Sequence, residues 1–240
     1  MFNPKFTFDS FVVGTHNNFA FAAAKAVAEA PGKSYNPLLI YGGVGLGKTH
    51  LLHAIGQHVA CNRKDAHIAS LTIEKFADEF INAIQNNQPS QYREKYLQTD
   101  LVLLDDLQFL AGKERLQEEF FHLFNALYEA HKQIVLACDR HPGTIPGLEQ
   151  RLVSRFEWGQ TADLQVPDLE TRLAILDKKA QWMGIQLPGD IRNFLADRIR
   201  TDVRRLEGAL IHVQSYASLT GKKLTLEVVE RLTREILHQE

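Results

Sequence analysis

Residues 42–49 read Gly-Gly-Val-Gly-Leu-Gly-Lys-Thr and match the phosphate-binding pattern G-x-x-x-x-G-K-[ST]. A short apolar run precedes them at 37–41 and a helical pattern follows from Leu51, so the loop has the strand and the helix that this pattern requires. Glycines let backbone N–H groups surround a phosphate, and the dipole of the following helix attracts the same anion. We expect Lys48 to reach the β- and γ-phosphates and the Thr49 hydroxyl to ligate Mg²⁺. The alternative is a glycine-rich turn with a solvated lysine, which would not require a strand before it and a helix after it.

Apolar runs and helical patterns alternate up to residue 166, which is typical of a parallel sheet covered by helices on both faces. We therefore expect an α/β fold. The predicted strands lie near 37–41, 66–71, 100–105, 133–138 and 162–166. The predicted helices of this part lie near 17–30, 48–60, 73–86, 90–97, 115–130 and 148–156.

The connection between the second and third predicted strands is long. It has about 28 residues, whereas a crossover of about a dozen is sufficient. Pro89 divides it into two helical segments, Ile73–Asn86 and Gln91–Leu97, because a proline interrupts a helix. The sequence therefore predicts one inserted helix at this point.

From residue 167 onward the strand-like runs stop, and the chain reads as helices near 168–183, 189–200, 202–220 and 225–238. Residues suited to N-caps precede three of them, and glycines lie at helix ends. We therefore expect a nucleotide-binding α/β domain at 1–166 and an α-helical lid domain at 167–240. The N-cap residues are Asp168, Asp202 and Thr225, and the glycines are Gly184, Gly189 and Gly221.

Composition limits the setting and the partners. Of 240 residues, 45% are hydrophobic and 23% are charged, as in an ordinary globular protein. The formal net charge of −2 gives no overall positive field, so any nucleic-acid contact must be local. Cys61 and Cys138 are the only cysteines, which excludes a disulfide framework, and the histidines lack metal-ligand spacing. No signal peptide or membrane-spanning run is present, so we expect a cytoplasmic protein that is not an integral membrane protein.

Two acids end the third predicted strand, Asp100-Leu101-Val102-Leu103-Leu104-Asp105-Asp106. A strand that delivers a carboxylate beside the phosphate loop is how P-loop enzymes hold Mg²⁺, so Asp105 is the metal candidate and Asp106 the candidate for polarising water. The alternative is that both acids cap the following helix. The next strand delivers Asp139 and Arg140 to the same edge, where open α/β sheets bind their ligands.

Three arginines are candidates for phosphoryl transfer. Arg151 and Arg155 lie four residues apart on one predicted helix, and Arg204 opens a helix of the predicted lid. An arginine assists the reaction only when it reaches γ-phosphate charge, in cis or from a neighbouring subunit. Spacing alone does not show this, and it favours surface ion pairing instead.

With these segments in place, the chain resembles the AAA+ domain of the DnaA family of bacterial chromosomal replication initiators along its whole length. Many P-loop proteins share the glycine loop, but the ordered series is specific, and an inserted helix after the second strand marks the initiator branch of AAA+ proteins. The resemblance implies an αβα sandwich with a five-stranded parallel sheet and a small helical lid. It rests on residues 3–8, 11–14, 35–38, 42–50, 104–109, 113–115, 117–121, 151–158 and 204–210.

The resemblance also implies roles for individual residues. Val12, Val13 and Asn17 would lie against adenine. Asp105 and Asp106 would serve the metal and the catalytic water, Asp139 would be the γ-phosphate sensor, and Arg204 would be the lid arginine that distinguishes ATP from ADP. Arg155 would be the finger that contacts ATP on the neighbouring protomer, with Arg151 supporting that interface. The remaining nucleotide contacts would be Gly43, Val44, Gly45, Leu46, Gly47, Lys48, Thr49 and His50.

The implied function is an ATP-controlled assembly. Protomers would stack head to tail with ATP and Mg²⁺ bound. Within this assembly, Ile81, Lys113 and Arg115 would bind single-stranded DNA of the replication origin. The resemblance extends to a replicative helicase, regulatory proteins and acidic phospholipid as partners, although basic and acidic residues nearly balance in the predicted lid. The family's C-terminal duplex-DNA-binding domain and its N-terminal partner-recruiting domain are not expected within these residues.

Two departures from the family pattern bear on chemistry. Ala137-Cys138 stands where the family usually has Thr-Ser before the sensor acid. Position 106 is Asp rather than the Glu of vigorous AAA+ motors, a feature that family members share, and it favours slow hydrolysis suited to a switch.

Three other functions compete with this interpretation. A helicase loader would share the glycine loop and the arginine finger but not the continuous initiator motifs. A metabolic P-loop kinase would need a closing lid, but neither an arginine in trans nor a long helical C-terminal segment with Val-Arg-Arg-Leu-Glu-Gly. A degenerate AAA+ scaffold would bind no nucleotide, and the intact Lys48, Thr49 and Asp105 oppose it.

Overall fold

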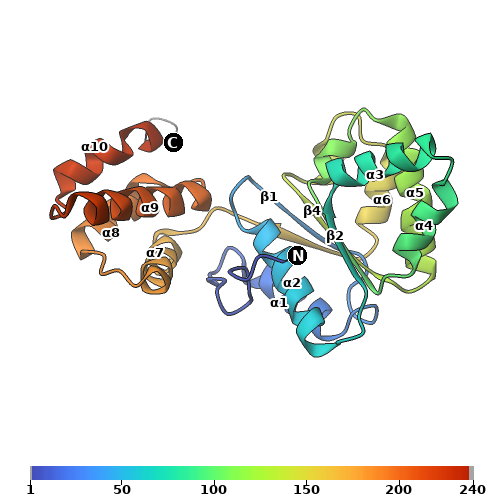
Figure 1. The fold of residues 1–240 in the computed structure, drawn as a ribbon, viewed down its shortest axis with the longest axis horizontal. Coiled ribbons are helices and arrows are strands. Elements are labelled where there is room, and N and C mark those ends of the chain that lie inside the picture. The colour runs from blue at the N-terminus through green and yellow to red at the C-terminus, as the bar shows by residue number, and fades with distance from the viewer. Residues whose placement is uncertain (1, 238–240) are drawn as a thin grey trace. The chain divides into compact units, whose positions relative to one another are not determined.

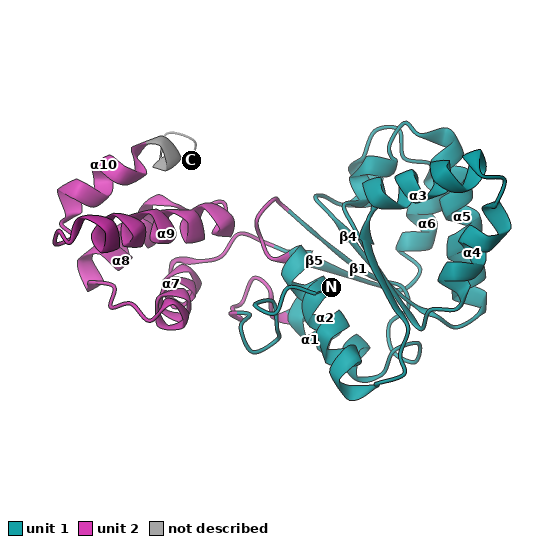
Figure 2. Ribbon diagram, viewed as in Figure 1, with its two compact units in different colours: residues 1–11, 19–42, 48–164 teal, residues 12–18, 43–47, 165–240 magenta. Residues whose placement is uncertain are grey.

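The structure is a computed structural model that describes residues 2–237, with side chains through residue 234. Contacts between Cα atoms divide the chain into two compact units (Figure 2). The first unit comprises residues 1–11, 19–42 and 48–164, and the second comprises 12–18, 43–47 and 165–240. The second unit thus includes two short segments from the predicted α/β domain. The domain boundary between residues 166 and 167 stays a prediction.

The first unit contains a five-stranded sheet in the order β2-β3-β4-β1-β5, with every pair parallel. The predicted α/β fold class with a five-stranded parallel sheet is therefore confirmed. All residues of β3 and β4 are buried, as expected for parallel strands covered on both faces. The strands are β1 (Leu38–Gly42), β2 (Ile68–Thr72), β3 (Leu101–Asp105), β4 (Gln133–Cys138) and β5 (Gln160–Leu164).

Helices cover both faces of this sheet (Figure 1). Helices α1 (Asn18–Glu29) and α2 (Lys48–Asn62) lie on one face. On the other face, Leu39, Val102 and Leu136 contribute to a core with aromatic side chains of the covering helices. Those helices are α3 (Ile73–Gln85), α4 (Pro89–Leu97), α5 (Glu114–Glu129) and α6 (Gln150–Phe156), and two 3₁₀ turns, η1 (Leu107–Leu110) and η2 (Pro142–Thr144), follow β3 and β4.

The inserted helix is present as α4, with Pro89 as its first residue, where a missing N–H costs nothing. Ion pairs fix it to its neighbours. Lys95 Nζ lies 2.6 Å from a carboxylate oxygen of Glu79 on α3, and Arg93 donates from Nε to Glu119 on α5 at 2.6 Å. The insertion is therefore a packed part of the first unit rather than a loose loop.

Strand β5 begins two residues earlier than its apolar run predicts, at Gln160 instead of residue 162. The Gln160 N–H donates to the Pro37 carbonyl oxygen at 2.9 Å, and Gln160 then pairs with Leu38 at the start of β1. The neighbouring strand sets the beginning of β5, and hydrophobicity does not reveal this.

The C-terminal part of the second unit is helical, as predicted. Asp168 and Asp202 cap α7 and α9 by accepting backbone hydrogen bonds, and Thr225 accepts one from Val228 at the start of α10. Gly184 and Gly221 take left-handed conformations after α7 and α9. The helices are α7 (Leu169–Met183), α8 (Gly189–Arg198), α9 (Val203–Thr220) and α10 (Leu226–Leu237).

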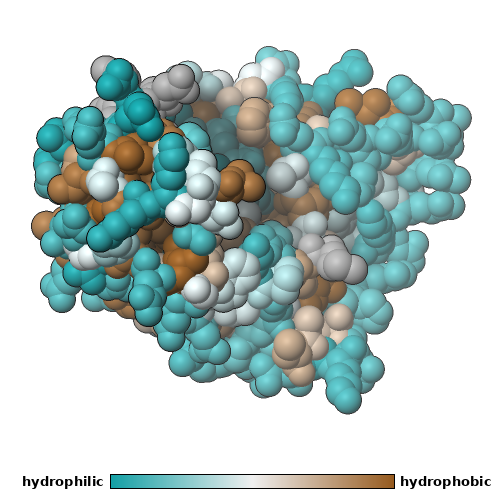
Figure 3. Space-filling view, turned by 60° about the vertical axis from the view of Figure 1, so that its left-hand side comes forward, coloured by the Kyte–Doolittle hydropathy of each residue, from teal (hydrophilic) through white to brown (hydrophobic). Residues whose placement is uncertain are grey.

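The core of these helices is formed by buried aliphatic residues such as Leu176, Leu195 and Leu210. The face in Figure 3 is largely hydrophilic, with apolar side chains gathered over the C-terminal helices. Among the described residues, no helix combines the length and the apolar character needed to span a membrane. The exposed large apolar side chains of this unit include Leu169, Trp182, Ile211, Leu219 and Leu226.

Candidate functional site

Sheet topology brings the predicted acids to one edge of the first unit. Strands β3, β4 and β1 are neighbours and parallel, so their carboxyl ends meet. Asp105 ends β3, Asp139 follows β4, and the glycine loop leaves β1 after Gly42. Ligands of open α/β sheets bind along this edge.

Lys48 and Thr49 begin α2 at this edge. Lys48 is only 8% exposed, and its Nζ donates to the Gly42 carbonyl oxygen at 2.7 Å. The Thr49 hydroxyl donates to Asp105 Oδ2 at 2.6 Å. The structure therefore brings the two predicted metal ligands into direct contact. Hydroxyl and carboxylate oxygens are the hard ligands that Mg²⁺ prefers, so this pair suits that ion.

Burial governs the electrostatics of Asp105, which is 9% exposed. Desolvation raises its pKa, and the Asp106 charge raises it further, while the hydrogen bond from Thr49 and the Lys48 charge oppose these effects. An ionised carboxylate in this position needs positive charge nearby. A bound cation would supply that charge, which favours a metal role over simple helix capping.

Asp106 has a left-handed backbone at φ 63° and precedes η1 without a side-chain cap. Its Oδ1 accepts a hydrogen bond from Gln108 Nε2 at 2.9 Å, and Gln108 Oε1 accepts one from the Asp139 N–H at 3.2 Å. One amide thus connects the end of β3 to the end of β4. The sequence interpretation missed this role of Gln108, and no motif spacing reveals it.

Asp139 forms a two-point ion pair with Arg140, with both nitrogen–oxygen distances 2.9 Å. The hydrogen bond from Arg140 lowers the pKa of Asp139, so this carboxyl is ionised at neutral pH. A free carboxylate would repel a phosphate. The pairing therefore places a guanidinium beside the predicted sensor residue.

The glycine loop from 43 to 47 belongs to the second unit. Gly45 and Gly47 have φ values of 78° and 101°, conformations that favour glycine. A Cβ atom on Gly45 would also come within 1.8 Å of Asp202 Oδ1. Arg204 is exposed, and its backbone N–H donates to the same Asp202 oxygen at 2.7 Å. Asp202 therefore shapes both the loop and the start of α9, a role that the sequence interpretation gave only as a cap.

The predicted adenine contacts also lie in the second unit. Asn17 is 5% exposed, and its amide nitrogen donates to the Val12 carbonyl oxygen at 3.0 Å. Its amide oxygen accepts from the Gly14 N–H at 2.9 Å. Asn17 thus holds this loop in shape. Val12 packs on the helical core, while Val13 is 45% exposed and available to a ligand.

His50 directs its side chain to the N-terminal segment. Its Nε2 lies 2.8 Å from the Thr7 carbonyl oxygen and 3.2 Å from the Ser10 hydroxyl. Its ring stacks on Phe6, with centroids 4.9 Å apart. The imidazole therefore fastens residues of the N-terminal segment to α2. The predicted nucleotide contact of His50 stays a prediction, and it would have to use the backbone.

The predicted finger, Arg155, lies on α6 with Arg151 one turn earlier. Arg155 is half-buried between two aromatic rings, Phe121 from α5 and Trp158 after α6. Arg151 is exposed, lies over the Phe121 ring at 4.7 Å and pairs with Glu149. The structure therefore brings both arginines to one surface, on a shared aromatic ring.

The predicted DNA contacts lie on two helices. Lys113 and Arg115 are exposed at the start of α5, which has no side-chain cap, so its first-turn N–H groups are available. Ile81 is 50% exposed on α3. Buried Gln117 donates to the Gly147 carbonyl oxygen at 2.9 Å and accepts from the Glu149 N–H at 2.8 Å. It thus ties the start of α5 to the start of α6, a contact that the sequence did not indicate.

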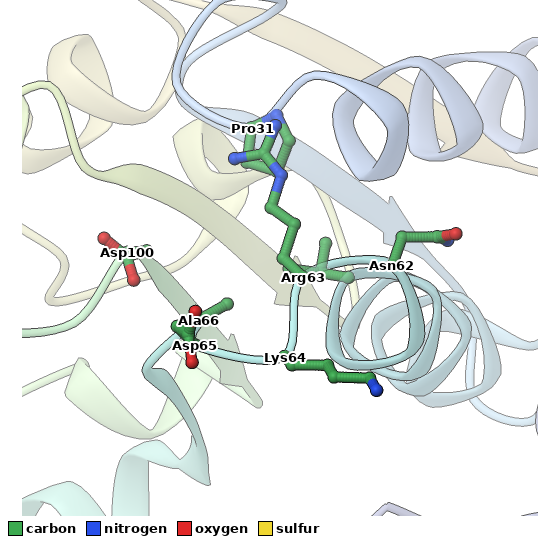
Figure 4. Close-up of a pocket in the computed structure, with 8 residues that line it drawn as sticks. Pro31, Asn62, Arg63, Lys64, Asp65, Ala66 and Asp100 are labelled. Atoms are coloured by element: carbon green, nitrogen blue, oxygen red, sulfur yellow. The ribbon is translucent and has the colours of Figure 1, made fainter.

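A separate cavity of about 450 Å³ lies at the opposite, amino-terminal edge of the strands, between Ala66 and Asp100. Figure 4 shows Arg63 extending toward Pro31 while Lys64 points elsewhere, so the charged groups do not converge on one point. We assign it no role.

Among residues 2–237, no group of three or more His, Cys, Asp or Glu side chains forms a metal site by itself.

Comparison with known proteins shows that this chain is similar to bacterial DnaA proteins in sequence and in structure. The model of the bacterial DnaA ATPase domain family matches residues 2–163. Domain III of the Thermotoga maritima replication initiation protein DnaA is 43% identical, with a TM-score of 0.95, and the match covers 99% of each chain.

Two further structures are similar over nearly the whole chain. They are the replication initiator DnaA bound to AMPPCP and single-stranded DNA, and AMPPCP-bound DnaA from Aquifex aeolicus. Each is 38% identical with a TM-score of 0.86, and each match covers 98% of this chain and 70% of the other. The Thermotoga maritima RuvB branch migration motor, 18% identical with a TM-score of 0.68, shares the fold alone.

Proposed function

Because this chain belongs to the family of bacterial DnaA ATPase domains of replication initiators, we propose that it binds ATP with Mg²⁺ and hydrolyses it slowly as a switch. The observation that carries the proposal is the contact between the Thr49 hydroxyl and Asp105 Oδ2 at 2.6 Å, with buried Lys48 beside it. The closeness of these three groups at one edge of the sheet supports a site for phosphate and Mg²⁺ there.

Each group at this edge has a proposed task. Lys48 neutralises the β- and γ-phosphates, and Thr49 and Asp105 hold Mg²⁺, which offsets phosphate charge when bound. Asp106, oriented by Gln108, positions the attacking water and accepts its proton. Asp139 and its partner Arg140 respond to the γ-phosphate. The short Asp106 side chain, half-buried and held by Gln108, favours slow turnover.

The remaining nucleotide contacts are proposed from the family resemblance. Val12, Val13 and Asn17 contact adenine, the loop from 43 to 47 contacts phosphate, and Arg204 distinguishes ATP from ADP. Support for the loop comes from the positive φ values of Gly45 and Gly47, because successive backbone N–H groups can form an anion-binding concavity where such conformations alternate with right-handed ones.

ATP binding is proposed to drive head-to-tail assembly, in which Arg155 reaches the ATP of the neighbouring protomer and Arg151 supports the contact. Single-stranded DNA then binds through Ile81, Lys113 and Arg115, repeated along the assembly. A related DnaA has been captured with AMPPCP and single-stranded DNA. A replicative helicase, regulatory proteins, acidic phospholipid and a cytoplasmic location also stay predictions from the resemblance.

Sedimentation velocity with ATP, with ADP and without nucleotide tests the proposal. We expect faster-sedimenting species only with ATP, because an arginine in trans needs a γ-phosphate to bind. The Lys48→Ala variant, run in parallel, should sediment as a monomer throughout. Equal sedimentation in all three conditions would contradict ATP-controlled assembly.

A further inference from the structure

Arg155 is held by aromatic rings rather than by acids. Its guanidinium carbon lies 4.2 Å from the centroid of the Trp158 ring and 5.7 Å from that of Phe121. Both distances fall within the range of cation–π attraction, which is strongest for tryptophan. Among the described residues, no carboxylate forms an ion pair with Arg155, whereas the neighbouring Arg151 pairs with Glu149.

The Trp158 ring is 59% exposed, yet a stack of rings supports it from the core. Trp158 stacks on Tyr128 with centroids 5.2 Å apart and planes 22° apart. Tyr128 in turn stacks on Phe124, which is 2% exposed and packs edge-on against Phe156 of α6. The orientation of an exposed ring is therefore fixed by buried side chains of α5 and α6.

This arrangement leaves the hydrogen bonds of Arg155 unused. A guanidinium forms hydrogen bonds through its N–H groups, and cation–π attraction to a ring does not use these donors as a carboxylate would. A carboxylate partner would occupy the same donors that a phosphate needs. An aromatic clamp thus fixes the position of the cation while its five N–H donors stay available to an anion.

We propose that Phe121 and Trp158 are positioning residues that hold the Arg155 guanidinium ready for the triphosphate bound to a second copy of this chain. The inference rests on the proposed function, in which Arg155 acts in trans. An arginine side chain has many rotamers, and ordering it only when protomers meet would weaken its effect. Rings that order it beforehand make the charge available without that loss.

The variant Trp158→Leu removes the flat ring, and Trp158→Phe retains one. Because Trp158 is largely exposed, both variants should fold and should bind ATP as monomers with unchanged affinity. The measurement is the hydrolysis rate at increasing protein concentration. We expect the concentration-dependent rate of Trp158→Leu to be about tenfold lower, because a misplaced catalytic group slows the reaction. Trp158→Phe should keep most of the rate.

Mixing variants separates a defect in trans from a defect in cis. Trp158→Leu retains its own ATP site, and Lys48→Ala retains an intact Arg155 but no nucleotide. Their mixture should hydrolyse ATP faster than either variant alone, because the Lys48→Ala protomer supplies a well-placed arginine. No recovery in this mixture, or a normal rate in Trp158→Leu alone, would overturn the inference.

The matched mixture of Arg155→Ala with Lys48→Ala tests the proposed function itself. Recovery there shows that Arg155 acts in trans, whatever Trp158 does. If this mixture fails to recover, the finger role of Arg155 is wrong. If it recovers while the Trp158→Leu mixture does not, only the positioning role is wrong.

Discussion

Lys48 and Arg155 are both cations of the first unit, and the fold holds them in opposite ways. Lys48 is 8% exposed and donates to the Gly42 carbonyl oxygen at the edge that also contains Asp105. Arg155 is half-buried and lies between the rings of Phe121 and Trp158. One cation is satisfied by polar groups of its own chain, and the other is only oriented.

The difference follows from where each charged group finds its partners, within its own chain or on another chain. A buried cation without polar partners is costly, so a lysine that is buried at this edge needs polar partners in its own chain. A partly exposed arginine on aromatic rings avoids that cost through solvent and cation–π attraction. The first arrangement suits a site within one chain, and the second suits a site that another chain completes.

Replacing Lys48 should have the largest effect. Lys48→Ala removes the cation that we propose faces the phosphates. Affinity for ATP and for ADP should therefore fall by about 100-fold or more, as for the loss of a buried charge partner worth about 3 kcal/mol. Calorimetric titration measures both affinities. Lys64→Ala, at an exposed lysine on the opposite edge of the strands, is the matched control. Unchanged affinity in Lys48→Ala would exclude the phosphate site.

Replacing Arg155 should separate assembly from binding. In Arg155→Ala the monomer should bind ATP normally, because the proposed finger acts on the ATP of the neighbouring protomer. ATP-dependent association and hydrolysis should fall by about tenfold or more, since arginine fingers contribute at least that much. Sedimentation and phosphate release measure the two losses, with Arg63→Ala as the control. If monomer affinity falls instead, Arg155 acts in cis and the contrast with Lys48 disappears.

The residues grouped around Lys48 could be predicted from the sequence, and those around Arg155 only in part. The glycine loop is contiguous, and parallel strands bring Thr49 and Asp105 to one edge by topology alone, so local patterns suffice. The helical core and the caps at Asp168 and Asp202 are likewise local signals. The family resemblance supplied Arg155 as a finger, where spacing favoured surface ion pairing.

What surrounds these residues could not be predicted, because it depends on packing between distant segments. Phe121 contacts Arg155 only because α5 packs beside α6, whereas Trp158 lies three residues after Arg155 in the chain; in the sequence both read as ordinary apolar positions. The same holds for the amides of Gln108 and Gln117, whose partners lie about 30 residues away. No periodicity indicates a polar bridge of that kind.

Removing the basic pair at the start of α5 should have a moderate effect that depends on nucleotide. We predict single-strand binding with ATP and little with ADP, because one protomer offers few phosphate contacts and an assembly repeats them. The double variant Lys113→Ala/Arg115→Ala should bind a labelled oligonucleotide about tenfold more weakly while keeping nucleotide affinity. Fluorescence anisotropy measures this.

The control for that experiment is Arg63→Ala/Lys64→Ala, which removes the same charge from the opposite edge. Arg155→Ala should lose DNA binding as well, since it prevents assembly without touching the basic pair. Equal binding with ATP and with ADP would show that DNA binding does not depend on assembly. Equal loss of binding in both double variants would show that it depends only on net charge.

The smallest expected effect concerns pH and again compares the region around Lys48 with half-buried Arg155. His53 lies on α2, one turn after Thr49, and its Nδ1 accepts a hydrogen bond from the Asn3 N–H at 2.9 Å. Its ring also contacts Phe2 and Phe6 edge-on, each at a centroid distance of 5.7 Å. Burial lowers the pKa of His53, and the Asp105 charge opposes that shift only in part.

Because the pKa of His53 is lower in the folded chain, the unfolded chain takes up a proton first as the pH falls. Stability is therefore complete above the ordinary histidine pKa of about 6.5 and declines below it. Burial lowers the pKa of His16 in the second unit in the same direction. We expect the melting temperature to fall by roughly 2 °C between pH 7.5 and 5.5 from His53, with a weaker decline in His53→Gln. The contact of Arg155 with Phe121 and Trp158 involves no histidine, so this change of pH should leave it unaffected. An identical decline in both proteins would show that the titration of His53 is not linked to folding.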